Sequence, residues 1–183
     1  MTTTSTAQPE EVAAALRGAG LADVDTSVRR RAEYSSDASN YRLAPTVVAY
    51  PRHTDEIIAA LAVARARGVP VVARGAGTSI AGNSIGTGLV LDTSRHLNRV
   101  LSVDPQERIA VVEPGSVLDT ITAAGRAHGL RFGPDPSTHS RCTIGGSIGN
   151  NACGSRALRY GRTADNVLEL DVVTGDGSRC SRE

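Results

Sequence analysis

The stretch Pro70-Val-Val-Ala-Arg-Gly-Ala-Gly-Thr-Ser79, followed by Ala81-Gly82, decides the fold of this chain. Its first half is apolar and β-branched, which predicts a short buried strand over residues 69–73. The strand then breaks into a loop in which two glycines flank one alanine, so the backbone is free to adopt positive φ and no Cβ blocks a ligand. Because successive N–H groups in such a loop can converge on an anion, the sequence predicts a phosphate-binding loop at the end of the strand.

A strand–helix–strand unit leads into this loop. Residues 46–50 predict a strand that Pro51 ends. A helix follows, with Thr54 as its N-cap and Gly68 just beyond its last turn. Ligands of such βαβ units bind beyond the carboxyl ends of the strands, and the loop Arg74–Ser79 stands at that position.

The rest of the chain divides at Pro45. We expect residues 1–44 to form an N-terminal extension, with a short helix from Pro9 and a polar loop over 23–42. Residues 45–183 are expected to form one dense domain. Beyond the glycine loop, the sequence predicts a strand at 88–92, a hairpin of 100–103 with 109–112, a helix at 116–128 capped by Ser116, a short strand at 130–132, and a strand at 167–174 with a hairpin turn at Asp176-Gly177.

A second glycine-rich block lies at Gly133–Thr138 and Cys142–Gly154. It is rich in Gly, Ser, Thr and Asn and has two isolated isoleucines, which predicts a surface where a ligand lies against main chain rather than a core. Two separate loops of this kind, each after a strand, indicate the two ends of one elongated ligand. The alternative is that they are unrelated turns without a ligand.

A Rossmann dinucleotide site is the main rival for the first loop. That site needs G-x-G-x-x-G at the start of a helix. Here Ile80 stands where the third glycine would be, and the residues 81–84 that follow are poor helix formers. The pyrophosphate of a ligand would therefore meet loop amides and not a helix N-terminus.

Composition excludes several other classes. A net charge of +1 argues against a dedicated nucleic-acid binder, and no apolar run is long enough to span a bilayer. The three cysteines form no C-x-x-C pair, so no metal site is predicted. Their odd number, without a signal peptide, favours a reducing, cytoplasmic compartment. The four histidines fit no Ser-His-Asp arrangement, and no catalytic residue is assigned.

The run from Pro45 to Gly177 resembles the FAD-linked oxidase family, whose members carry a PCMH-type FAD-binding domain and include vanillyl-alcohol oxidase and FAD-dependent D-lactate and glycolate dehydrogenases. The order and spacing of many short blocks carry the resemblance. These blocks are Val71–Ser79, Ala81-Gly82, Leu89–Asp92, Val112–Gly115, Gly133–Ser137, Thr143–Gly146, Asn150–Gly154, Tyr160-Gly161 and Val172–Gly177. The blocks Gly133–Ser137 and Asn150–Gly154 look most like those of large bacterial members in which the flavoprotein is joined to an iron–sulfur oxidoreductase part.

This resemblance implies an α+β, PCMH-type FAD-binding fold with a small N-terminal βαβ subdomain and a larger mixed sheet flanked by helices, truncated at its C-terminus. It implies non-covalent FAD, because Thr78 stands where some relatives carry a histidine that binds FAD covalently. The implied contacts of the FAD pyrophosphate are Arg74, Gly75, Ala76, Gly77, Thr78 and Ser79, with Gly82 in support. The implied lining of the flavin and ribityl side is Pro134, Asp135, Pro136, Ser137, Thr143, Gly145, Gly146 and Gly149, with Asn150 nearby and Gly161 in a further cofactor-facing turn.

The implied function is the FAD-binding portion of a flavin-dependent enzyme that oxidises a 2-hydroxy acid, such as D-lactate or glycolate, by hydride transfer to FAD. Relatives continue into a substrate-binding cap domain, so we expect a fragment or one subunit of a split enzyme, with a C-terminal cap or an iron–sulfur subunit as partner and a small-molecule substrate in the full-length enzyme. Two alternatives stay open: a non-catalytic remnant or assembly subunit without flavin, and an NADPH-dependent flavin reductase of the cell-wall precursor type.

Overall fold

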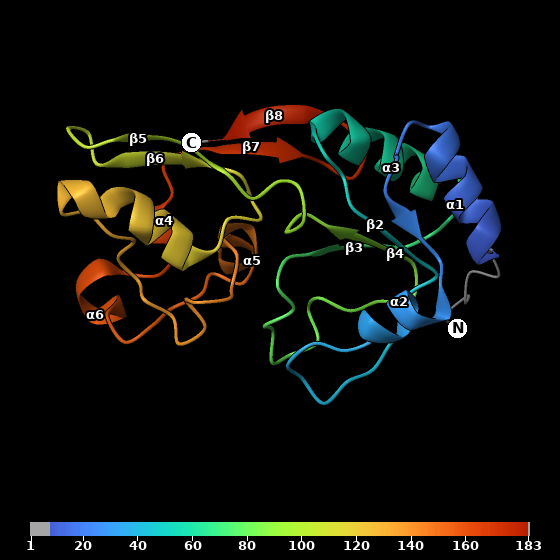
Figure 1. Ribbon diagram of the computed structural model, residues 1–183, viewed down its shortest axis with the longest axis horizontal. Helices are drawn as coiled ribbons and strands as arrows, with labels where there is room; N and C mark the ends of the chain where they lie inside the picture. Colours follow the sequence, from blue (N-terminus) through green and yellow to red (C-terminus); the bar gives the residue numbers. More distant parts are fainter. Residues whose placement is uncertain (1–7, 183) are drawn as a thin grey trace.

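The computed structural model describes residues 8–182, which form two lobes along the long axis of the molecule (Figure 1). The first lobe contains α1 (Pro9–Gly18), β1 (Val24–Asp25), α2 (Val28–Glu33), β2 (Val47–Ala49), α3 (Thr54–Ala66), β3 (Val71–Arg74) and β4 (Leu89–Asp92). From there the chain continues through β5 (Val100–Asp104), β6 (Ile109–Val112), α4 (Leu118–Gly125), α5 (Ile144–Gly149), α6 (Ala157–Tyr160), β7 (Leu170–Val173) and β8 (Arg179–Arg182), with 3₁₀ turns at Arg126–His128 and Ala164–Asn166. Together these elements confirm the α+β class.

The sheet of the first lobe confirms the predicted strand–helix–strand unit and adds a strand inside it. Its strand order is β1-β2-β4-β3, with β2, β4 and β3 parallel and β1 antiparallel. Val90 of β4 pairs with Val48 on one side and with Val72 on the other. Strands β2 and β3 of the unit β2–α3–β3 are therefore not neighbours in the sheet, because β4 lies between them. All three parallel strands end at the same edge of the sheet.

Residues that precede Pro45 contribute to the core of this lobe. Val12 and Leu16 of α1 are fully buried and belong to the same cluster as Ala60 of α3 and Leu89 of β4. A helix as short as α1 is marginal in water, so its stability comes from this packing. Segment 9–25 is thus part of the packed first lobe.

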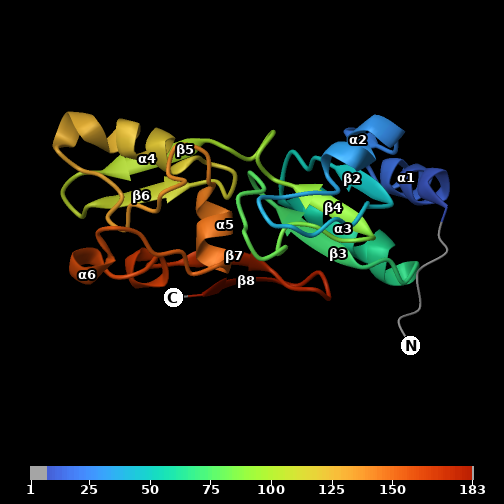
Figure 2. The same cartoon turned by 90° about the horizontal axis from the view of Figure 1, so that it is seen from below.

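The second lobe is built around two antiparallel hairpins. The β5–β6 hairpin packs its inner face against α4, and the small core between them includes Leu118 and Ile121. The β7–β8 hairpin turns at Asp176-Gly177, with φ of +86° at the glycine, and reaches back to α3. Both predicted hairpins are confirmed. Figure 2 shows α5 between the two hairpins in that view. Among residues 8–182, no helix combines the length and the apolar character needed to cross a membrane.

Three local predictions were wrong. Residues 130–132 form no strand, and the N–H of Leu130 instead donates to the carbonyl of Gly125 at the end of α4. Thr54 is not the N-cap of α3 but its first residue, and His53 precedes it without a side-chain cap. The Ser116 hydroxyl does not cap α4, which begins at Leu118; it donates to the carbonyl of Arg99 instead.

Two segments expected to be irregular contain regular structure. The polar stretch 23–42 contains β1 and α2. Pairing with β2 stabilises β1. The Ser27 side chain caps α2 by accepting from the N–H of Arg30. The second glycine block contains α5, which Thr143 caps by accepting from the N–H of Gly146. Ile144 of α5 is buried in the second-lobe core, so this block does contribute to a core.

Candidate cofactor site

The glycine loop leaves β3 at the carboxyl edge of the sheet. Gly77 has φ of +68° and Gly82 has φ of +78°, a conformation in which side chains other than hydrogen are strained. The backbone N–H groups from Gly75 to Ser79 donate no hydrogen bond to any of residues 8–182. Unpaired amides in a half-buried loop need a partner, and an anion is the partner that a run of such donors suits.

The turn that closes this loop is made by one side chain. The Ser79 hydroxyl accepts from the N–H groups of Ala81 and Asn83, both at 3.2 Å, and donates to the side-chain oxygen of Asn83 at 3.1 Å. Local hydrogen bonding of this kind lets Ser and Asn replace helix or sheet pairing. The loop is therefore defined at its far end without using its own amides.

Helix α5 lies opposite the loop, so the structure brings the two glycine blocks together. A Cβ on Gly75 would lie 2.0 Å from the Thr143 hydroxyl oxygen, which means that the loop touches the start of α5 with no room for a side chain. A second link joins Asn83 to Asn150, whose side chains are hydrogen-bonded at 3.1 Å. Gly149 has an open face, since a Cβ there would meet no atom within 4 Å. The glycine loop and α5 are therefore in contact at two points, Gly75–Thr143 and Asn83–Asn150.

The Arg74 side chain points away from the open side of the loop. Its guanidinium donates to the carbonyls of Ser84 and Ser36, at 3.1 and 3.0 Å, and lies over the ring of Tyr34. A Cβ on Gly77 would come within 2.5 Å of it, so the guanidinium fills the inner side of the loop. Arg74 thus lies at the start of the loop, but its guanidinium is directed to the carbonyl oxygens of Ser36 and Ser84.

The remaining predicted site residues fall into two groups. Gly145 and Gly146 lie on α5, and a Cβ on Gly145 would clash with Pro114 at 2.9 Å. Residues Pro134, Asp135, Pro136 and Ser137 lie in a separate turn. No hydrogen bond or ion pair within residues 8–182 joins this turn to the glycine loop.

Asp135 is the centre of that separate turn. It has φ of +58° and forms ion pairs with Arg131 at 2.8 Å and with Arg156 at 3.3 Å. Asp135 and Pro136 line a groove of about 610 Å³ beside α4. Gly161, with φ of +75°, is required by its own turn, since a Cβ there would meet the Asp165 carboxylate. The contacts within their own turns therefore account for an aspartate at position 135 and a glycine at position 161.

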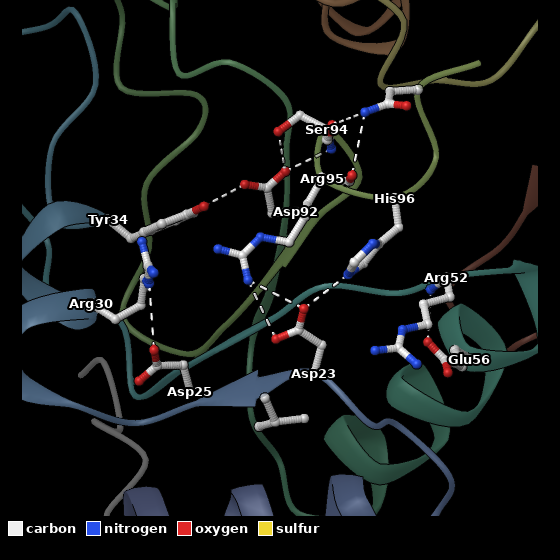
Figure 3. Close-up of polar contacts among 12 residues, drawn as sticks. Asp23, Asp25, Arg30, Tyr34, Arg52, Glu56, Asp92, Ser94, Arg95 and His96 are labelled. Atoms are coloured by element: carbon white, nitrogen blue, oxygen red, sulfur yellow. Dashed lines mark hydrogen bonds and ion pairs between the residues drawn. The ribbon is translucent and has the colours of Figure 1, made fainter. Parts of the chain in front are cut away.

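Sequence reasoning did not assign the residues behind the loop. Tyr34 and Asp37 lie under it, and Figure 3 shows the Tyr34 hydroxyl directed at the Asp92 carboxylate at the end of β4. Burial and this hydrogen bond raise the pKa of Tyr34, so the phenol keeps its proton as a donor. The only sequence signal was Asp37 two residues before Ser39, a spacing typical of a local turn.

Comparison with known proteins agrees with this geometry. A protein-family model described as an FAD binding domain matches residues 45–181. The chain is 40% identical over 161 residues to glycolate oxidase subunit GlcD of Bacillus subtilis, covering 86% of this chain and 34% of that protein. It is 36% identical over 169 residues to D-2-hydroxyglutarate dehydrogenase of Pseudomonas putida, covering 90% and 17%. The chain therefore spans about a third or less of the length of these relatives.

Solved structures show the same fold at lower identity. An alkyldihydroxyacetonephosphate synthase superposes with a TM-score of 0.81 at 21% identity, covering 97% of this chain and 36% of that one. Xylooligosaccharide oxidase from Myceliophthora thermophila superposes with a TM-score of 0.79 at 24% identity, covering 96% and 37%. The N–H groups of Gly75 to Ser79, which have no partner among residues 8–182, are donors of the kind that a pyrophosphate would need. The family match confirms FAD as the cofactor, and the chain belongs to the FAD binding domain family of the FAD-linked oxidases.

Proposed function

We propose that this chain is the FAD-binding portion of a flavin-dependent oxidoreductase that oxidises a 2-hydroxy acid of the D-lactate or glycolate type, with FAD held non-covalently. One observation carries the cofactor site: the five N–H groups from Gly75 to Ser79 have no hydrogen-bond partner within residues 8–182, and their loop contacts the start of α5. The names of the relatives, a glycolate oxidase subunit and 2-hydroxy-acid dehydrogenases, support the substrate class.

In this proposal the loop binds the pyrophosphate through main chain alone. A hydrogen bond to a charged oxygen contributes about 1.5–3 kcal/mol, so even three of the five amides supply a substantial part of the affinity. The Arg74 side chain adds no direct contact, because its donors are already used behind the loop. Thr78, in place of a covalent histidine, leaves the cofactor exchangeable.

The facing helix would hold the other half of the cofactor. Thr143, Gly146, Gly149 and Asn150 lie along α5 or at its ends, and a Cβ on Gly149 would meet no described atom within 4 Å. FAD supplies the hydride acceptor of such reactions when bound, and the protein supplies position and environment. The base that removes the hydroxyl proton is assigned to no residue of this chain. A cap domain or a partner subunit would provide it together with the substrate pocket.

Cofactor binding is tested by titrating the purified chain with FAD in a calorimeter and by desalting the mixture. We expect a saturable binding isotherm and a yellow protein fraction. The same sample should not oxidise D-lactate or glycolate with a dye acceptor at enzyme-like rates, since this proposal assigns the base to a cap domain or a partner subunit. A colourless fraction with no binding heat would instead favour a remnant or an assembly subunit. Enzyme-like turnover by the chain alone would overturn the assignment of the base to another part.

A further inference from the structure

We propose that residues 34–41, here called the brace, are a built-in support that holds the glycine loop in its anion-binding conformation. The inference rests on the proposed FAD site and adds positioning residues to it. The brace precedes the stretch 45–181 that the FAD binding domain model matches. It would thus be a part of the cofactor site that lies outside the recognised domain.

Arg74 is the centre of the support. Its two Nη atoms donate to carbonyls on opposite sides of the loop, one to Ser36 of the brace at 3.0 Å and one to Ser84 at 3.1 Å. Its guanidinium also lies 4.7 Å from the centre of the Tyr34 ring. A planar fork with a stacking face makes all three contacts at once, which an ammonium group cannot do. Arg74 thereby connects the end of β3, the brace and the return of the loop.

The brace also bonds to the loop directly. The N–H of Ala38 donates to the carbonyl of Gly77 at 3.1 Å. The Asp37 carboxylate accepts from the hydroxyl of Ser84 at 3.0 Å and from its N–H at 3.4 Å. Burial alone would raise the pKa of Asp37, but hydrogen bonds from Ser39 and Ser84 outweigh it and hold the pKa below its ordinary value. Asp37 is therefore an ionised acceptor at neutral pH.

Both ends of the brace are anchored. At its start, the Tyr34 hydroxyl donates to the Asp92 carboxylate at 2.5 Å, and the N–H of Ser94 donates to the other oxygen of that carboxylate at 2.7 Å (Figure 3). At its end, the ring of Tyr41 lies against Gly82, where a Cβ would come within 2.9 Å of it. The brace is thus fixed to the sheet on one side and covers the far end of the loop on the other.

The loop needs this support because its own amides are unused. From Gly75 to Ser79 no N–H bonds to residues 8–182, so the hydrogen bonds that hold the loop come from the Ser79 hydroxyl at its far end and from the brace behind it. A loop held in its binding conformation loses less conformational freedom when the ligand arrives, which strengthens binding. Loss of the brace should therefore weaken FAD binding without removing any atom that contacts FAD.

The first test compares Asp37→Ala with Glu56→Ala. Glu56 is a buried carboxylate, whereas Asp37 is half-buried. Glu56 accepts from the N–H of Arg52 at 2.7 Å, but it lies on α3 and has no hydrogen bond to the brace or the loop. We expect Asp37→Ala to weaken FAD binding about tenfold or more, equivalent to about 1.4 kcal/mol. Glu56→Ala should lower thermal stability and leave the dissociation constant unchanged. Equal affinity in wild type and Asp37→Ala would overturn the brace.

The second test is Arg74→Lys, which keeps the positive charge and loses the fork. If Arg74 acts behind the loop, FAD binding falls about tenfold although the charge is retained. If Arg74 contacts phosphate as a simple charge, the affinity stays near that of the wild type and the proposal fails. Arg74→Lys also tests the brace if the Asp37→Ala protein does not fold.

Hydrogen exchange of the cofactor-free protein separates the brace from the proposed function. The amides of Ala38 and Asn83, which donate to the Gly77 carbonyl and the Ser79 hydroxyl, should exchange at least about tenfold faster in Asp37→Ala and Arg74→Lys than in the wild type and in Glu56→Ala, because local opening is easier. Unchanged exchange in both variants would overturn the brace whatever FAD does. If the two variants exchange faster than the wild type but the wild type binds no FAD, the brace is supported and the FAD assignment is rejected.

Discussion

Gly75 and Thr143 touch across the two lobes: a Cβ on Gly75 would lie 2.0 Å from the Thr143 hydroxyl oxygen. Thr143 is itself fixed, because it is buried and caps α5 by accepting from the N–H of Gly146. Gly75 of the first glycine block therefore packs against a fixed side chain of the second block. This contact and the Asn83–Asn150 hydrogen bond are the points at which the proposed cofactor site is assembled from both lobes.

The first prediction concerns Gly75→Ala. The added methyl group must displace Thr143, and overpacking of this kind costs about 1–3 kcal/mol of unfolding free energy. We expect lower thermal stability and at least about tenfold weaker FAD binding by calorimetry. The control is Gly18→Ala at the end of α1, where a Cβ meets no atom within 4 Å. Wild-type affinity in Gly75→Ala would show that the lobes do not need this contact.

A second prediction separates stability from binding at Gly149. A Cβ at this helical position meets no atom within 4 Å, so Gly149→Ala should keep or raise the free energy of unfolding, by up to about 1 kcal/mol. The same methyl group would fill the open face proposed for the cofactor, and FAD binding should weaken. Denaturant unfolding of the cofactor-free protein and FAD titration measure the two effects. Unchanged FAD affinity would place the cofactor elsewhere.

Two buried serines should respond in opposite directions to alanine. The Ser147 hydroxyl is buried and has no hydrogen-bond partner among residues 8–182. Ser147→Ala in the cofactor-free protein should leave the free energy of unfolding unchanged or raise it by about 1 kcal/mol, because an unsatisfied polar group is removed. The Ser116 hydroxyl donates to the carbonyl of Arg99 at 2.9 Å. Ser116→Ala should therefore lower the free energy of unfolding by about 1 kcal/mol. Urea unfolding of both variants checks the pair.

The fourth prediction is a pH dependence from Glu113. Arg99 donates to its carboxylate from the backbone N–H and from the guanidinium, both at 2.8 Å. The Arg99 hydrogen bonds, opposed by burial, hold the pKa of Glu113 below its ordinary value. A lowered folded-state pKa stabilises the protein at pH above the unfolded value of about 4.3, and this contribution is lost as the pH falls through the folded value.

Glu113→Gln should therefore lower the free energy of unfolding by about 1–2 kcal/mol at pH 7. The difference from wild type should shrink as the pH falls below about 4. Chemical denaturation at a series of pH values measures it. Asp171→Asn is the comparison, since its pair with Arg179 is largely exposed and such pairs contribute about 1 kcal/mol or less. A constant difference across the pH range would contradict this role of Glu113.

Much of the local structure was predictable because it follows from nearest neighbours in the chain. Alternating and helical periodicities located β2, α3, β3, β4 and both hairpins to within a few residues. Failures occurred where a long-range partner overrode a local preference. Ser116 has the right residue type for a cap, but its hydroxyl finds the Arg99 carbonyl. Ile144 sits among glycines, yet it is buried in the core beneath α4.

By itself, the sequence determined that a strand ends in a loop with two glycines, that a second glycine-rich block follows, and that the order of blocks resembles that of an FAD-binding domain. Only the tertiary structure decided that β4 inserts between β2 and β3, that Gly75 meets Thr143, and that the Arg74 guanidinium turns inward onto the brace. The reason is physical. Glycine content and periodicity depend on neighbouring residues, whereas strand order and the direction of a guanidinium depend on donors and acceptors that the fold brings from distant parts of the chain.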